Sequence, residues 1–291
     1  MVEVLYNSLY SNYMAEISIL QLNIFQGKFL DRVISFVKEH DIDILHFQEV
    51  SGGQFSGGGE YTYPDNRLQA QAEKNASSSP QYAGLNIFQE IKKRLNFEGI
   101  FAPRVVLKGD HDSFNANATF FKKSFPLIEH KIFWLKEFYE AEDRETVNWK
   151  GAGYNAIATR FEVGNKKLWT VNTHLAWGPR PFDEAYKLEI NMPLVAHMGK
   201  MEAPWILSGD FNVDKNSATV KALDELGRNL AVENNFINTL NPRIHPAQNL
   251  FPPGLAVDFV FTSPEIKVTQ CQLIDSIDLS DHFGILTQIE I

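Results

Sequence analysis

Acidic and amide side chains follow several short apolar runs of the sequence, at points where strands are expected to end. The sharpest cases are the motifs SGDFN (208–212) and SDH (280–282). Asp210 and Asn212 come directly after the apolar run WIL, and their spacing of two places both side chains on one side of a strand end. The full set of candidate site residues is Asn23, Glu49, His174, Asp210, Asn212, Asp258, Asp281 and His282.

The residue types in this set indicate a site for a hard divalent cation. Carboxylate and amide oxygens are the ligands that Mg²⁺ and Mn²⁺ prefer in proteins. Carboxylates gathered without a metal repel one another, which raises their pKa values. A divalent ion removes that cost and supplies a Lewis acid. We therefore expect Mg²⁺, or Mn²⁺, as the cofactor of a hydrolytic centre.

Each candidate also has an ordinary explanation when it is taken alone. Asn23 has the position of a turn residue, Glu49 that of a solvated strand end, and His174 that of a core histidine. Asp258 stands among apolar neighbours, where a carboxylate is costly unless it is paired. The ordinary explanations account poorly for the occurrence of all these residues together and in this order.

Hydrophobic periodicity predicts many short strands with a few helices between them. Helices are expected at 29–40, 85–95, 182–200, with a kink or break at Pro193, and 217–227. Strands are expected at 17–22, 43–50, 118–124, 127–135, 154–163, 166–175, 203–212, 257–263, 266–274 and 284–291. Strands dominate both halves of the chain, which predicts two β-sheets packed face to face with helices outside.

The 291 residues are consistent with one large domain, and the predicted organisation is an extension over 1–16 and a single domain over 17–291. Within it lies a Gly/Ser-rich loop over 51–80, interpreted either as a substrate-facing flap or as a disordered insertion. Cys271 is the only cysteine and is expected to be a packing residue.

Charge and leader patterns restrict the partners and the compartment. The net charge of −9 disfavours tight, non-specific binding of duplex nucleic acid through the overall field, although a local basic groove or a bound metal can reverse the sign at a site. No signal peptide or transmembrane segment is recognisable. The expectation is a cytoplasmic monomer.

Seven segments of the chain, in this order, resemble the endonuclease/exonuclease/phosphatase (DNase I-like) superfamily. They are QLNI (21–24), FQEV (47–50), NATFFKKSFPL (117–127), VNTHL (171–175), ILSGDFNVD (206–214), VDFVF (257–261) and LSDHFGI (279–285). The resemblance implies an α/β (α+β) fold, a four-layered α/β/β/α sandwich of two packed mixed β-sheets flanked by helices. The site would lie at one end of the two sheets.

The resemblance also implies which residues bind metal. Glu49 corresponds to the principal metal-binding glutamate, and Asn23 to an asparagine that helps to hold metal or phosphate. Asp281 corresponds to a carboxylate on the metal side, and Asp210 to one that can bind a second metal.

The implied catalytic roles fall on the remaining motif residues. Asp210 and Asn212 correspond to the pair that positions the attacking water and the phosphate. His282 corresponds to the histidine that contacts the scissile phosphate, and Asp258 to the carboxylate that orients it. His174 corresponds to a histidine that protonates the leaving group in DNase I-like and sphingomyelinase-like members.

Two features depart from the family pattern. Val257 stands where many members have an arginine before the motif aspartate, so a cation is missing there or comes from elsewhere. No acidic partner for His174 is recognisable. The loops WGPRP (177–181) and PRIHP (242–246) are candidates for substrate contacts through Trp177, Arg180, Arg243 and His245, or are ordinary Pro-rich loops.

The sequence thus predicts a phosphoesterase that uses in-line attack of water on a phosphate ester. Nucleic acid is the favoured substrate. The alternative is a small-molecule or lipid phosphoester, as for sphingomyelinases and inositol phosphatases. A non-catalytic binding module is a third class, and it is disfavoured because every acidic and histidine position of the site is filled.

Overall fold

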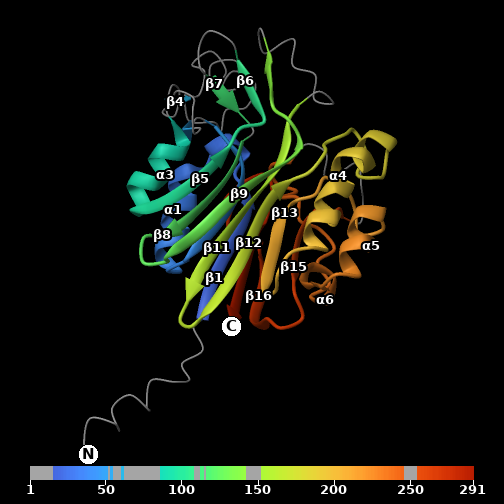
Figure 1. The fold of residues 1–291 in the computed structure, drawn as a ribbon. Coiled ribbons are helices and arrows are strands. Elements are labelled where there is room, and N and C mark those ends of the chain that lie inside the picture. The colour runs from blue at the N-terminus through green and yellow to red at the C-terminus, as the bar shows by residue number, and fades with distance from the viewer. Residues whose placement is uncertain are drawn as a thin grey trace, which may run out of the picture.

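The computed structural model describes residues 16–51, 53–54, 60–61, 86–107, 112–114, 116–141, 152–245 and 254–291. In this part of the chain two six-stranded β-sheets pack face to face, and helices cover their outer faces (Figure 1). This arrangement confirms the α/β/β/α sandwich of two mixed sheets.

The first sheet contains both ends of the described chain. Its strands, in spatial order, are β16 (Lys267–Ile274), β17 (Gly284–Glu290), β1 (Glu16–Asn23), β2 (Ile44–Val50), β8 (Ala116–Lys122) and β5 (Phe97–Ala102). Only β1 and β2 pair in parallel, and the other neighbours are antiparallel. The parallel pair brings Asn23 and Gln48 side by side at the carboxyl ends of both strands.

The second sheet repeats this design with one parallel pair at its centre. Its strands, in spatial order, are β14 (Arg228–Asn229), β15 (Asp258–Thr262), β13 (Trp205–Asp210), β12 (Lys166–His174), β11 (Tyr154–Val163) and β9 (Leu127–Lys136). β12 and β13 are parallel and the other neighbours are antiparallel. His174 and Asp210 are register partners at the carboxyl ends of this pair.

The sheets are joined by an apolar layer and by a buried polar bridge. Phe121 of β8 and Phe161 of β11 meet edge to face, with ring centroids 5.0 Å apart. The ring of His46, on β2, lies 2.7 Å from the hydroxyl of Ser208 and 3.0 Å from that of Thr170, both on the second sheet. The apolar layer supplies most of the burial, while the His46 bridge fixes how one sheet lies on the other.

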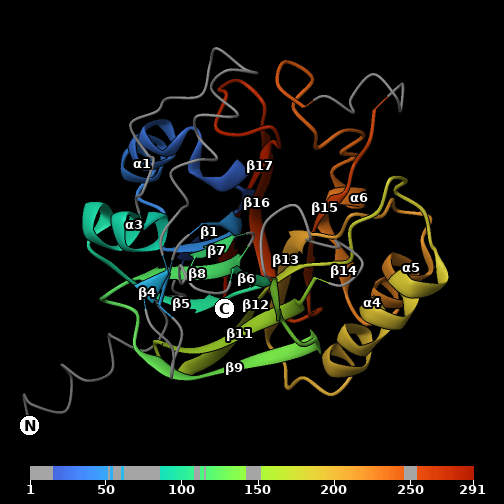
Figure 2. The same ribbon diagram turned by 90° about the horizontal axis from the view of Figure 1, so that it is seen from above.

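Helices cover the outer face of each sheet. The bounds are α1 (Leu30–Glu39), α3 (Ile87–Leu95), α4 (Ala185–Met198), α5 (Ala218–Asp224) and α6 (Leu230–Glu233). Helices α1 and α3 pack on the first sheet and α4 and α5 on the second, so the two pairs lie on opposite sides (Figure 2). The helices expected at 29–40, 85–95 and 217–227 are confirmed with shifts at their ends.

Two details of the predicted elements were wrong. The helix expected at 182–200 does not break at Pro193, because α4 runs on to Met198 with the proline inside it. Pro193 has no backbone N–H, so α4 lacks the one hydrogen bond that this residue would donate to the carbonyl one turn earlier in the helix. Strand β5 was not predicted, because its sequence FEGIFA is short and is interrupted by a glycine.

The remaining elements are short. They are the 3₁₀ turn η1 (Phe25–Gly27) and the strands β3 (Gly53–Gln54), β4 (Glu60–Tyr61), β6 (Val105–Leu107), β7 (Asp112–Phe114) and β10 (Tyr139–Ala141). The predicted extension lies outside the described residues apart from Glu16, which begins β1, and most of the predicted loop at 51–80 also lies outside them. None of the described helices has the length and apolar character that a membrane crossing requires.

Candidate active site

The candidate residues meet where the two parallel strand pairs end. Asn23 ends β1, Glu49 lies near the end of β2, and His174 and Asp210 end β12 and β13. Asp258 begins the antiparallel neighbour β15 and is the register partner of Asp210. The topology alone therefore brings these side chains to one end of the sandwich.

The backbone is strained at several of these positions. Glu49, Asn212 and Phe25 have φ angles of 57°, 54° and 48°, in the left-handed region that side chains other than glycine seldom adopt. Glu49 lies in an irregularity of the β2–β8 pairing between Phe47 and Val50. Such strain is tolerated where the surrounding structure holds it, and it redirects the Glu49 side chain towards the site.

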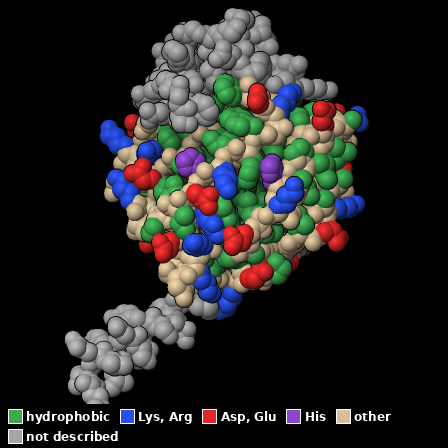
Figure 3. All heavy atoms as spheres, in the orientation of Figure 1, with side chains coloured by type: hydrophobic (Ala, Val, Ile, Leu, Met, Phe, Trp, Pro, Cys, Tyr) green, Lys and Arg blue, Asp and Glu red, His purple; other side chains and the backbone are tan. Residues whose placement is uncertain are grey.

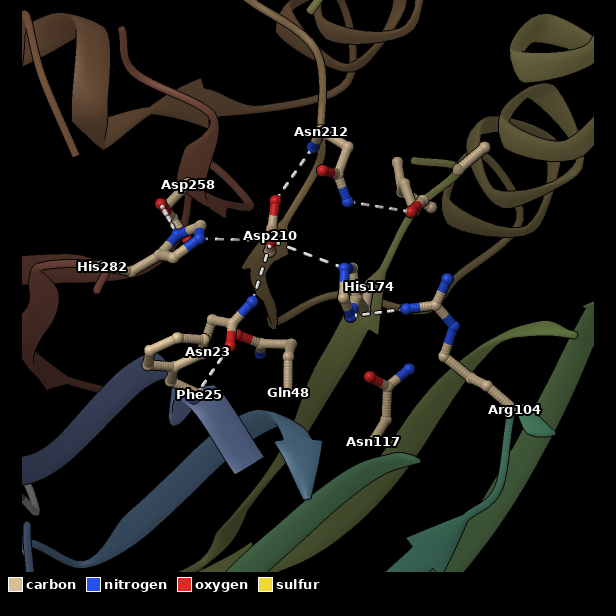
Figure 4. A network of polar contacts seen from close by, with 12 residues as sticks. Asn23, Phe25, Gln48, Arg104, Asn117, His174, Asp210, Asn212, Asp258 and His282 are labelled. Atoms are coloured by element: carbon tan, nitrogen blue, oxygen red, sulfur yellow. Dashed lines mark hydrogen bonds and ion pairs between the residues drawn. The ribbon is translucent and has the colours of Figure 1, made fainter. Parts of the chain in front are cut away.

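Asp210 is the centre of the hydrogen-bond network (Figure 4). Its Oδ2 accepts from Nδ2 of Asn23 at 3.1 Å, and the Nε2 atoms of His174 and His282 lie 3.4 Å and 3.9 Å away. Its Oδ1 accepts from the backbone N–H of Asn212 at 3.0 Å. Burial, reinforced by the nearby Asp258 and opposed by His282, raises the pKa of Asp210 to about 6. The carboxylate therefore has the pKa of a group that accepts protons near neutral pH.

His282 is held by Asp258. Its Nδ1 lies 2.9 Å from Oδ2 of Asp258. Burial lowers the pKa of His282, but the carboxylates of Asp258 and Asp210 outweigh it and raise that pKa well above the ordinary value. The raised pKa favours the imidazolium form of His282. A cation here suits the stabilisation of a negatively charged phosphoryl group better than proton abstraction.

A chain of buried amides supports this histidine from below. Nε2 of Gln21 donates to Oδ1 of Asp258 at 2.9 Å and to Oε1 of Gln48 at 3.0 Å. Nε2 of Gln48 in turn donates to Oδ1 of Asn172, on the second sheet, at 2.7 Å. Both oxygens of Asp258 are thus engaged, which fixes the orientation of the imidazole.

His174 has an arginine as its partner in place of an acid. Nη1 of Arg104 lies 2.7 Å from Nδ1 of His174, and Nε of Arg104 donates to the carbonyl of Gly153 at 3.0 Å. A guanidinium only donates hydrogen bonds, so Nδ1 of His174 must accept and the ring proton sits on Nε2. Burial, with added repulsion from Arg104 and His282, holds the pKa of His174 well below its ordinary range. His174 is thus a neutral imidazole with its N–H directed to the Asp210 side.

The arginine is itself unusual. Arg104 is 1% exposed, its guanidinium lies over the ring of Tyr154 at 4.5 Å, and its Nη2 has no hydrogen-bond partner. No carboxylate pairs with it among the residues that the structure describes. Arg104 is therefore a buried cation beside the site. It comes from a different part of the chain than position 257, where many family members have an arginine and this chain has Val257.

Glu49 and Asp281 complete the acidic side of the site. Burial raises the pKa of Glu49, with His282 and a hydrogen bond from Asn23 acting against it. Burial also raises the pKa of Asp281 to about 6, and Glu49 adds to this effect. Carboxylates held at elevated pKa by burial and by one another fit a divalent cation, which would relieve their repulsion.

Two groups in the described part of the chain have ligand atoms within 4.8 Å of one another: His245 with Asp281 and His282, and Asp210 with Asp258 and His282. In the second group, Nδ1 of His282 already forms a hydrogen bond with Asp258. That group is therefore better suited to holding and transferring protons than to binding a metal. Glu49 belongs to neither group and lines the same cavity.

These side chains line one half of a cavity of about 190 Å³. The polar half comprises Asn23, Glu49, His174, Asp210, Asn212, Asp281 and His282. The apolar half comprises Phe25, Trp177, Pro179, Pro181, Leu240, Leu255 and Val257. Among the predicted site residues, only Asp258 lies behind the cavity wall, where it holds His282.

The predicted substrate-contacting loops are partly at the cavity. Trp177 and His245 line it, and burial, with His282 nearby, lowers the pKa of His245 to about 4. Arg243 and Arg180 do not line it. Arg243 is turned outwards, where its Nε bonds Asp278 at 2.6 Å, so a role for it at the phosphate is not supported.

Sequence reasoning missed the supporting residues. Arg104 lies in none of the matching segments, whereas Gln21, Gln48 and Asn172 lie inside QLNI, FQEV and VNTHL but were not singled out as site residues. The available signal was a polar side chain at an inward-facing strand position, as in ISILQLN and WTVNTH, where burial demands a partner.

The fold and the site can be compared with those of known families. A sequence profile of the Endonuclease/Exonuclease/phosphatase family matches residues 20–282. The chain therefore belongs to this family. No curated protein sequence matches it.

Solved structures share the fold at low identity. A family protein from Leptotrichia buccalis has a TM-score of 0.65 at 17% identity, covering 94% of this chain and 100% of that one. A mannosyl-6-phosphatase from Bacteroides thetaiotaomicron has a TM-score of 0.60 at 18%, covering 94% and 99%. D. rerio TDP2, complexed with single strand DNA product, has a TM-score of 0.60 at 14%, covering 95% and 100%. At these identities the likeness supports the fold alone.

Proposed function

We propose that the protein hydrolyses phosphate esters with the help of a divalent cation, Mg²⁺ or Mn²⁺. The observation that carries the proposal is the buried Asp210, which lies between two histidines of opposite character. His174 is neutral and presents an N–H, whereas His282 is paired with Asp258 and is cationic. A site that combines a proton acceptor, a neutral donor and a fixed cation suits phosphoryl transfer to water.

Glu49, Asn23, Asp281 and Asp210 are the residues that would hold the cation. Their side chains line one cavity, and burial, with added repulsion from neighbouring carboxylates, raises the pKa values of Asp210 and Asp281 to about 6. When bound, the cation supplies Lewis-acid polarisation of the phosphate.

Asp210 accepts the proton of the attacking water. Its Oδ2 faces the cavity beside Asn23, and its Oδ1 is fixed by the backbone N–H of Asn212. The side chain of Asn212 donates to the carbonyl of Leu175 at 3.2 Å, which secures the strained turn after β13. The general base is thus held at a single orientation.

The two histidines act on the phosphate from different sides of Asp210. The imidazolium of His282 offsets the charge that develops on the phosphoryl oxygens. His174 directs its Nε2–H to the leaving oxygen, where a neutral donor stabilises the departing group by hydrogen bonding. Because burial holds the pKa of His174 below its ordinary range, we propose that His174 acts as a hydrogen-bond donor and that the leaving oxygen takes its proton from water.

The cavity supports a compact phosphoester over a long nucleic acid. Among the described residues its lining contains no lysine or arginine. Figure 3 shows the face over the second sheet, away from the cavity; acidic and basic side chains are interspersed there too, and the described residues of that face form no large basic patch. Polynucleotide binding draws most of its affinity from phosphate contacts with such groups. A small or lipid-like ester therefore fits better than the nucleic acid favoured by the sequence.

A substrate panel in Mg²⁺ or Mn²⁺ tests this function. It comprises plasmid DNA, single-stranded oligonucleotides, abasic DNA, sphingomyelin, inositol phosphates and small aryl and alkyl phosphates. We expect turnover of at least one small ester and loss of that turnover in His282→Ala, with unchanged thermal unfolding. The proposal fails if no member of the panel is hydrolysed, or if His282→Ala is as active as the native protein.

A further inference from the structure

The loop that follows β12 presents an exposed tryptophan on a rigid backbone. Trp177 is 46% exposed and lines the cavity three residues after His174. Its carbonyl accepts from the hydroxyl of Tyr186, on α4, at 2.5 Å. A Cβ at Gly178 would collide with that hydroxyl and with Lys187, so the glycine lets helix and loop approach this closely.

The far end of the loop is anchored as firmly. The buried ammonium group of Lys187 donates to the carbonyls of Arg180 at 2.6 Å and of Asn212 at 3.0 Å. The backbone N–H of Asp214 donates to the carbonyl of Pro181 at 2.8 Å. The loop is thus tied to the turn that carries Asn212, and the indole is held at a set place relative to the catalytic centre.

The indole of Trp177 does not pack against another ring in the described part of the chain. None of the ring contacts found among the described residues involves Trp177. Phe182, in the same loop, is 50% exposed but does not line the cavity. Both side chains are exposed, but of the two only Trp177 lines the cavity, where a bound substrate can reach it.

The chemistry of the remaining wall restricts what can lie against that face. Pro179, Pro181, Leu240, Leu255 and Val257 line the same cavity and add apolar surface to it. A ligand with several hydroxyl groups would leave them without partners here, at a cost in affinity. A second phosphate would find no lysine or arginine among the described lining residues.

We propose that Trp177 is a specificity-determining residue that stacks on an uncharged aromatic ring carried by the leaving alcohol of the substrate. The inference rests on the proposed phosphoesterase function and narrows its substrate class. A flat aromatic ring gains most from an indole face, and stacking of this kind tolerates many ring types. His174, three residues earlier in the chain, then meets the ester oxygen between ring and phosphorus.

Kinetics on matched esters test the proposal. Benzyl phosphate, cyclohexylmethyl phosphate and a hexose 6-phosphate are all esters of primary alcohols, so the ring is the main difference among them. Each is also offered as its methyl diester. For the native protein in Mg²⁺ or Mn²⁺ we expect kcat/KM for the benzyl ester to exceed the others roughly 10-fold.

Variants in the loop distinguish the loss of stacking from a general disturbance of the loop structure. Trp177→Ala should bring the benzyl and cyclohexylmethyl esters to parity, mainly through KM, and Trp177→Phe should retain most of the preference. Phe182→Ala is the matched control and should keep native selectivity. The inference is overturned if Trp177→Ala keeps the benzyl preference, or if the hexose ester or an oligonucleotide is the best native substrate.

A binding measurement keeps this inference distinct from the proposed function. Benzylphosphonate and cyclohexylmethylphosphonate are not hydrolysed, and their affinities are measured by calorimetry for the native protein and for Trp177→Ala. Tighter binding of benzylphosphonate that depends on Trp177, without turnover of any ester, would support the stacking site and reject the phosphoesterase. Equal binding of both phosphonates would reject the stacking site whether or not esters are hydrolysed.

Discussion

Arg104 shows how much of the site depends on a residue with no motif. It donates to Nδ1 of His174 and thereby places the ring proton on Nε2, facing Asp210. An acid in the same place would do the opposite, since a carboxylate accepts from Nδ1–H and favours the imidazolium. The identity of one buried partner thus decides whether this histidine donates a hydrogen bond or a proton.

Replacing Arg104 by methionine should separate activity from stability. We expect kcat/KM to fall by roughly 10²-fold, because the His174 tautomer is no longer fixed. The melting temperature should stay level or rise, because a buried cation without a carboxylate partner gives way to an apolar side chain. The readouts are steady-state kinetics, thermal unfolding and ¹⁵N chemical shifts of the His174 ring.

The control for this variant is Arg160→Met. Arg160, on β11, pairs with Glu129 and Glu202 and does not line the cavity, so its replacement should leave kcat/KM unchanged. Native-like activity of Arg104→Met, or a native His174 tautomer in that variant, would contradict the assigned role.

At the residue scale the sequence predicted the groups that line the cavity and, of the groups behind them, only Asp258. Asp210, His174 and His282 follow apolar runs in recognisable motifs, and they converge as expected. Arg104 and Gln21 act through contacts with residues 70 and 237 positions away in the chain. Pairings at that separation are set by the folded structure, so a single sequence holds no local sign of them.

At the scale of elements, close pairing of β12 with β13 sets the position of Asp210. Gly209 is the register partner of Thr173, and a Cβ at Gly209 would overlap the carbonyl oxygen of Thr173. The glycine of the SGDFN motif is therefore a packing requirement of the parallel strand pair. It places the aspartate at the strand end without pushing the strands apart.

Gly209→Ala should therefore lower both stability and activity. We expect a loss of about 2–4 kcal/mol in the free energy of unfolding, typical of overpacking in a close contact, and a large drop in kcat. Denaturant unfolding and kinetics provide the two readouts. Gly199→Ala is the matched control, since Gly199 is at the end of α4 in helical conformation, with no atom closer than 3.5 Å to the new Cβ. Equal stability of the two variants would contradict this account.

The bridge between the sheets makes a prediction about pH. Burial lowers the pKa of His46 to about 3, while in the unfolded chain it returns to about 6.5. Between pH 6.5 and about pH 3, His46 binds a proton in the unfolded state but not in the folded state. The free energy of unfolding therefore falls as the pH falls through this range. Relative to His46→Gln, the native protein should lose about 1.4 kcal/mol between pH 7.5 and pH 5.5.

Urea unfolding of both proteins at the two pH values measures this difference. The comparison with His46→Gln is needed because Asp210 and Asp281 titrate in the opposite sense, their folded pKa values being raised to about 6. A native-minus-variant difference that does not depend on pH would show that His46 is not the acid-sensitive group.

Most elements of this sandwich were predictable because strand and helix periodicities differ. The helix at Leu30–Glu39 buries Val33, Ile34 and Val37 at helical spacing. The strand β5 and the short pairs near the site have too few residues for a pattern, and their conformation is set by neighbouring strands.

For the whole molecule, the acidic balance and the crowded carboxylates predict stabilisation by metal. The net charge is −9, and burial raises the pKa values of Glu49, Asp210 and Asp281. Because the raised values mean that ionisation costs folding energy above pH 6, a cation should stabilise the fold more at pH 7.5 than at pH 5.5. At ten times the dissociation constant the gain is about 1.4 kcal/mol.

Thermal unfolding with and without Mg²⁺ or Mn²⁺ at both pH values measures this effect. The shift should shrink in Glu49→Gln, whose side chain offers the cation a weaker ligand. A shift of the same size in that variant would place the cation elsewhere on the protein.

The most direct test of the phosphoesterase is the metal-dependent hydrolysis of a small phosphate ester by three proteins. Native protein and Glu39→Gln, which alters an exposed glutamate at the end of α1, should turn over the ester in Mg²⁺ or Mn²⁺ and lose activity in chelator. Glu49→Gln should be at least about 10²-fold slower while unfolding like the native protein. Turnover that survives chelation, or native activity in Glu49→Gln, would contradict the proposed function.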